Sequence, residues 1–231
     1  MNWFYIFITI AIVTGLIYFM RCGGQNKQLA FIDNYRFHPA IRKKLSAKHP
    51  LLSDQQLDLV FDGLRDYFYI CNQASNKMVS MPSQVVDDAW HEFILFTRAY
   101  QQYCKKALGR YLHHTPAEAM SSPTLAQHGI KRAWRLACAK DEINPKAPLL
   151  LPLLFGIDAQ LNIENGFRYS PDCRKPNSPN YGSDYCASHI GCSSGCSGDS
   201  GALTGDGGSD GGFFDGFGDS DGCGGSGCGG D

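Results

Sequence analysis

One short stretch of the sequence gathers carboxylate, imidazole and thiol side chains. Asp87 and His91 stand four residues apart, Cys104 follows on the same predicted helix, and His113 and His114 come soon after it. Side chains at positions i and i+4 of a helix are neighbours, so Asp87 can meet His91. A carboxylate beside an imidazole fixes the tautomer of the ring, as it does for many metal-bound histidines. Asp87, His91 and one of the two later histidines, His113 by preference, are therefore a candidate divalent-metal site.

Other interpretations of these residues stay open at this point. Asp87 can orient His91 inside the fold without a metal, and the later histidines can bond a helix end or its neighbour. Within the predicted helical domain at 31–175 there is no G-x-S-x-G, H-E-x-x-H or phosphate-binding loop, so no residue is assigned as catalytic and a non-enzymatic role is favoured. Cys104 is a poor partner for His91, because a straight helix would separate the two residues by about 20 Å.

A single helix over 83–109 is expected to carry most of this stretch. Ser83 is a good N-cap, and Gly109 suits a left-handed cap at the other end. At 100° per residue, one face of the helix collects the apolar and aromatic positions. The predicted structural core of the motif is Val86, Trp90, Phe93, Tyr100 and Cys104. Only the flank with Asp87 and His91 is then left for chemistry.

The rest of the body is predicted to be mainly α-helical. Ser53 and Gln56 form a capping box, and apolar residues follow at helical spacing from Leu57 to Cys71. Further helices are expected around 39–47, after a second capping box at 115–118, from 123 onward, and as one or two turns within 149–161. Strand signals are weak, so a compact helical bundle is the expected fold.

The N-terminus is predicted to be a transmembrane anchor. Residues 3–20 carry no charge and, as a helix, would rise about 27 Å against a hydrocarbon core of roughly 30 Å. A cleaved signal peptide would need basic residues before this run, and only Met1 and Asn2 precede it. Basic residues gather after the run, which predicts an N-terminus outside and a body in the cytoplasm. The expected organisation is an anchor at 1–21, a polar linker at 22–30, a helical domain at 31–175 and a tail at 176–231.

Charge divides the chain into a basic body and an acidic tail. All 21 Lys and Arg precede residue 176, together with 14 of the 22 acidic residues, and the tail holds the other 8 and no basic residue. The tail also contains 18 Gly and few aliphatic residues, so it is predicted to be disordered. Its negative charge disfavours nucleic-acid binding, although the basic body leaves RNA binding open. In a reducing cytoplasm the ten cysteines are not expected to form a disulfide framework.

The motif resembles a segment of the glycine-rich domain-containing proteins, which occur in plants and as shorter bacterial proteins. The matching positions, which read V-D-x-x-W-H and then Tyr and Cys, are Val86, Asp87, Trp90, His91, Tyr100 and Cys104. The membrane segment and the Gly/Cys-rich tail are similar to those of uncharacterised bacterial membrane proteins. The resemblance implies a location in the bacterial inner membrane and no particular reaction. The plant pattern reads W-H-x-H, and Phe93 at the second His position weakens a metal site built on that pair.

The sequence therefore predicts a single-pass membrane protein whose cytoplasmic helical domain binds a protein partner or acts as a scaffold. The alternative is a metal-binding protein or metal-dependent enzyme that uses Asp87, His91 and His113. A divalent metal is the one cofactor that the sequence suggests, and nucleic acid is the least favoured partner.

Overall fold

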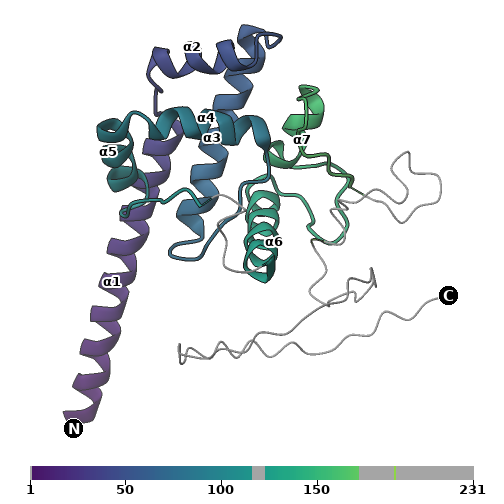
Figure 1. Cartoon of the computed structure of the whole chain (residues 1–231). Helices are drawn as coiled ribbons and strands as arrows, with labels where there is room; N and C mark the ends of the chain where they lie inside the picture. Colours follow the sequence, from purple (N-terminus) through teal and green to yellow (C-terminus); the bar gives the residue numbers. More distant parts are fainter. Residues whose placement is uncertain (1, 116–122, 172–189, 191–231) are drawn as a thin grey trace, which may run out of the picture. The chain divides into compact units, whose positions relative to one another are not determined.

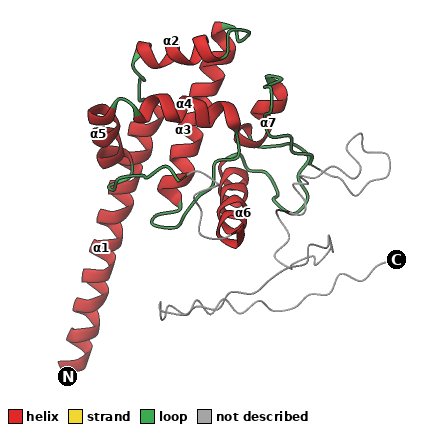
Figure 2. Ribbon diagram, in the orientation of Figure 1, coloured by secondary structure: helices red, strands yellow, loops and turns green. Residues whose placement is uncertain are grey.

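The fold is built from helices throughout the part of the chain that the structure describes (Figure 1, Figure 2). This computed structural model describes residues 2–115, 123–171 and 190. The helices, in chain order, are α1 (Asn2–Asp33), α2 (Pro39–Lys48), α3 (Asp54–Gln73), α4 (Gln84–Ile94), α5 (Thr97–Ala107), α6 (Pro123–Lys140) and α7 (Leu153–Gln160). No strand occurs among these residues, and the predicted mainly α-helical class is confirmed.

The stretch at 22–30, predicted to be a polar linker, is part of α1. Its side chains dock on the body, where Gln25 Nε2 donates to Asn72 Oδ1 at 3.4 Å and Asn72 Nδ2 donates to Gln28 Oε1 at 2.9 Å. A glycine pair suggests a linker in the sequence, but a helical Gly costs only about 1 kcal/mol. Contacts with the body offset that cost, so the helix continues.

The predictions of an N-terminal anchor and of a C-terminal tail are not confirmed by the described residues. The transmembrane anchor predicted over 1–21 falls on α1, and no helix among the described residues is long and apolar enough to cross a membrane. The tail at 176–231, apart from residue 190, lies outside the described residues. The capping box at 115–118, apart from Thr115, lies outside them as well.

The body is assembled around α3, which α1, α4, α6 and α7 all contact. Its start has the predicted capping box, since Ser53 N donates to Gln56 Oε1 at 2.8 Å and Gln56 N donates to Ser53 Oγ at 3.3 Å. Gly63 permits a close crossing with α4, because a Cβ there would lie 2.9 Å from Val86 Cγ2. This crossing packs the apolar face of α4 on α3 and leaves the polar flank of α4 outside the core.

The helix predicted over 83–109 is in fact two helices, α4 and α5. Phe96, between them, has φ −83° and ψ 58°, which is not helical geometry. The break contains neither Pro nor Gly, so its cause is tertiary rather than local. It turns α5 so that the rings of Tyr100 and Tyr103 each lie 5.3 Å from the ring of Phe93, centroid to centroid. Aromatic packing thus overrides the uninterrupted helix that the spacing predicts.

A buried carboxylate of α7 holds the beginning of α4. Asp158, only 2% exposed, accepts hydrogen bonds from Ser83 Oγ at 2.7 Å, Gln84 N at 2.7 Å, Val85 N at 3.2 Å and Phe167 N at 2.9 Å. The first N–H groups of a helix lack partners within the helix, and a carboxylate there also interacts favourably with the helix dipole. Asp158 therefore fixes the helix that carries the V-D-x-x-W-H motif.

Candidate functional site

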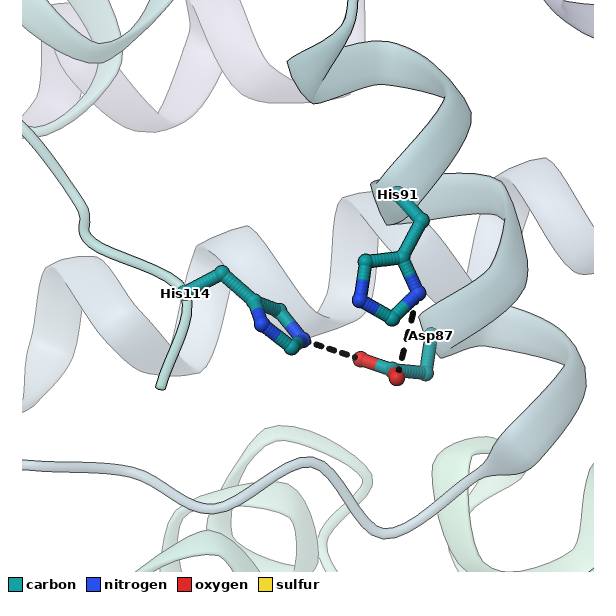
Figure 3. Close-up of side chains that lie close together, drawn as sticks. All are labelled: Asp87, His91 and His114. Atoms are coloured by element: carbon teal, nitrogen blue, oxygen red, sulfur yellow. Dashed lines mark hydrogen bonds and ion pairs between the residues drawn. The ribbon is translucent and has the colours of Figure 1, made fainter. Parts of the chain in front are cut away.

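Asp87, His91 and His114 come together on the outer flank of α4 (Figure 3). His114 Nε2 lies 3.0 Å from Asp87 Oδ1, and His91 Nδ1 lies 3.5 Å from Asp87 Oδ2. The two imidazole rings are 4.2 Å apart, centroid to centroid. Asp87 and His91 stand on successive turns of α4, whereas His114 belongs to the chain that returns after α5. One carboxylate thus contacts two imidazoles from separate segments.

The spacing of these donor atoms suits a single metal ion. One ligand atom from each residue can be chosen so that all three lie within 4.8 Å of one another. Nitrogen and oxygen ligands bind divalent metals at about 2.1 Å, which places two ligands about 3.0 Å apart in an octahedral site and about 3.4 Å apart in a tetrahedral one. Asp87 contacts the two imidazoles through different oxygens, Oδ1 at 3.0 Å from His114 Nε2 and Oδ2 at 3.5 Å from His91 Nδ1, and these separations are of the same size.

Aromatic residues of the motif fix the segment that carries the third donor. Gly109, at φ +69°, has the predicted left-handed conformation and turns the chain after α5. Tyr100 OH then donates to Leu112 O at 2.6 Å and accepts from Trp90 Nε1 at 3.1 Å. The Trp90 ring also packs against the His114 ring, with centroids 4.6 Å apart. Trp90 and Tyr100 therefore position His114 beside α4.

The structure brings His114, and not His113, to Asp87 and His91. The ring of His113 packs instead on Tyr111, two residues earlier, at a centroid distance of 4.7 Å. Alternate residues of an extended segment share one side, so His113 goes with Tyr111 and His114 faces the other way. The sequence prediction of His113 fails to anticipate this arrangement, because two adjacent histidines look alike until the register of the segment is known.

Tyr100→Phe tests the positioning of this segment. The change leaves Leu112 O and Trp90 Nε1 without their buried partner, and we expect it to lower the free energy of unfolding by about 1 to 3 kcal/mol. Thermal unfolding of the full chain, followed by near-UV circular dichroism, measures the loss. Tyr111→Phe is the matched control, because the side chain of Tyr111 is partly exposed. Equal stability losses in the two variants would contradict the assigned role of the Tyr100 hydroxyl.

A pocket of about 740 Å³ opens beside the three donors, all of which line it. The aromatic side chains in its walls are Tyr67, Trp90, Tyr111, Phe167 and Tyr169. Lys77 and Arg110 also line the pocket and add positive charge. The sequence motif points to Trp90 alone among these residues. The others come from α3, from the connection between α3 and α4, from the returning chain and from the segment after α7, and no local pattern indicates that they meet.

The predicted structural core of the motif lies inside the fold. Val86, Trp90, Phe93, Tyr100 and Cys104 are all buried. Burial raises the pKa of the Cys104 thiol, and it raises the pKa of Cys71, which lines the pocket, to about 12. Both thiols are therefore protonated at neutral pH and contribute apolar surface rather than a thiolate nucleophile.

Comparison with known proteins gives one family. A family model described as UCP032817-like matches residues 27–190 of the chain. The match includes Asp87, His91 and His114, and it leaves out the apolar run at 3–20. No curated protein sequence and no solved structure matches the chain. The resemblance to glycine-rich domain-containing proteins is not tested by these findings and stays a prediction.

Proposed function

The chain belongs to the UCP032817-like family, and we propose that its helical body binds one divalent metal ion through Asp87, His91 and His114. The observation that carries this proposal is the convergence of three donor side chains from two segments at the edge of a pocket. A structural role alone would need only one imidazole beside Asp87. The side chain of His91 is 47% exposed, so packing does not require it there. It is available as a ligand.

The donor set defines what the site can hold. Two imidazoles and one carboxylate are accepted by first-row divalent metals such as Mn²⁺, Fe²⁺, Co²⁺ and Zn²⁺. Three protein ligands leave coordination positions open, and the pocket gives a small molecule access to them. An ion held there supplies a Lewis acid to whatever binds in the pocket. No side chain is assigned as a general acid or base, and the proposal is one of metal binding.

Mn²⁺ binding to the full chain in detergent micelles tests this proposal. Thiolates prefer softer metals, so Mn²⁺ reduces interference from the ten cysteines. The electron paramagnetic resonance signal of free Mn²⁺ measures how much metal the protein removes from solution. We expect one saturable site per chain above weak binding by the acidic tail. Absence of a saturable site would overturn the proposal.

A location at the inner membrane, with the N-terminus outside and the body in the cytoplasm, is part of the same proposal. Its support is the uncharged run at 3–20 and the exposure of apolar side chains on the first half of α1, where Trp3, Phe7 and Ile12 are 75%, 67% and 64% exposed. Large exposed apolar surfaces mark membrane or protein contacts. We expect the full chain, but not residues 22–231 alone, in the carbonate-washed membrane fraction. Recovery of the full chain in the soluble fraction would contradict this location.

A protein-interaction or scaffold role is the second candidate function. Leu149 and Leu150 favour it, because these adjacent side chains are 91% and 72% exposed in the connector before α7. A photo-crosslinker at the exposed Ala147 should then give a specific adduct in cells. The adduct should disappear when both leucines are replaced by Ser, and an adduct that persists would remove this candidate.

A further inference from the structure

We infer that the pocket beside the three donors takes an anionic ligand with a flat aromatic body and a metal-binding head group. This inference rests on the proposed metal site and adds the class of ligand that the metal-loaded pocket would bind.

The aromatic walls favour a planar apolar ligand body. Tyr67 and Trp90 form a buried wall, with ring centroids 5.0 Å apart, and Trp90 packs in turn against the ring of His114. Tyr111 and Phe167 also line the pocket and are partly exposed, so a ligand can reach their rings. Aromatic rings bind other rings through stacked and edge-to-face contacts as well as through burial of apolar area. A volume of about 740 Å³ is within the range of small-molecule sites.

The charge of the metal-loaded pocket favours an anion. A divalent ion brings two positive charges, and Asp87 offsets one of them. Arg110 adds a further positive charge, and its Nη2 donates to the carbonyl oxygens of Cys71, at 3.4 Å, and of Ser75. Within the described part of the chain, no carboxylate pairs with Arg110. The loaded pocket is thus net positive, and a ligand with negative charge would complement it.

Arg110 lines the pocket and is held at the C-terminal end of α3. Tyr67 is linked to the donors through Trp90, whereas Arg110 bonds to Cys71 and Ser75, which follow Tyr67 in the chain. At 1.5 Å per residue, Cys71 lies about 6 Å from Tyr67 along α3, and Ser75 follows the end of the helix. A carboxylate on the ring carbon opposite the head group would point away from the metal, and Arg110 is a cation of the pocket that would complement it.

Three hydroxamates provide the test on the Mn²⁺-loaded full chain. Acetohydroxamate has the head group alone, benzohydroxamate adds the ring, and 4-carboxybenzohydroxamate adds the carboxylate. We expect benzohydroxamate to bind at least about tenfold tighter than acetohydroxamate, and the added carboxylate to tighten binding by a further threefold or more. Calorimetric titration measures the three affinities in wild type, Arg110→Gln, Arg110→Lys and Arg98→Gln. Arg98 is the control, because its side chain is exposed and lies outside the pocket.

The variants separate the ligand class from the metal site. The gain from the carboxylate should vanish in Arg110→Gln and survive in Arg110→Lys and Arg98→Gln. Equal affinities for acetohydroxamate and benzohydroxamate, or a carboxylate gain that survives in Arg110→Gln, would overturn the inference while Mn²⁺ binding still stands. If Arg110→Gln does not fold, the wild-type series decides the ligand class, because a carboxylate that does not tighten binding to the wild-type chain would overturn the inference. If the wild-type chain binds no Mn²⁺, the proposed function fails, and this inference fails with it.

Discussion

Asp87→Asn is expected to weaken Mn²⁺ binding by at least about 100-fold. Asp87 contacts both imidazoles and supplies the only negative charge among the three donors. Loss of a group that merely supports a metal ligand costs 10- to 100-fold in affinity, so loss of the charged ligand itself should cost no less than the upper value. Titration of each variant with Mn²⁺, followed through the resonance signal of the free ion, gives the affinities directly.

The two adjacent histidines provide the matched control for this prediction. His114→Ala should lose metal affinity to a similar degree, whereas His113→Ala should stay within about threefold of wild type, because its ring packs on Tyr111 and is not among the three donors. Both variants remove the same side chain from neighbouring positions, so a general effect on folding would weaken them alike. A loss confined to His113→Ala would restore the ligand set that the sequence predicts and would contradict the register of this segment.

Asp158→Ala is expected to lower the free energy of unfolding by about 3 to 5 kcal/mol, the largest effect on stability that we predict. The change leaves the N–H groups of Gln84, Val85 and Phe167 without their acceptor, together with the hydroxyl of Ser83. Unsatisfied buried donors cost more than the net gain of the hydrogen bonds that they once made. For a body of this size the melting temperature should fall by about 10 °C or more.

Near-UV circular dichroism of the full chain is suited to this measurement, because it reports the buried Trp90 and Trp134. Asp33→Asn is the control, since Asp33 is exposed at the end of α1. A melting temperature of Asp158→Ala within about 2 °C of that control would contradict the role given to the buried carboxylate.

Local patterns in the sequence were enough to predict the helical class and the positions of several helix ends. Ser53 and Gln56 signal a capping box at the start of α3, and the positive φ of Gly109 follows from the residue type. The break at Phe96 could not be found in this way, because nothing in the local sequence interrupts a helix. It arises where the rings of α5 pack on Phe93, and such contacts depend on the whole fold.

The candidate site was also predictable only where local helical geometry determines it. The spacing of Asp87 and His91 on one helix indicates their contact, since helical geometry brings residues four apart together. The third donor depends on the register of a non-helical segment, which Tyr100 and Trp90 fix through tertiary hydrogen bonds. Arg110 and the aromatic walls of the pocket likewise meet only in the folded chain.

The imidazole nitrogens around a bound ion test the central claim most directly. Electron spin echo envelope modulation of the Mn²⁺-loaded full chain detects and counts coordinated histidines. The proposed site predicts two coordinated imidazoles in wild type and in His113→Ala, and one in His114→Ala and in His91→Ala. A spectrum without imidazole nitrogen in wild type, or one that His114→Ala leaves unchanged, would contradict metal binding by Asp87, His91 and His114.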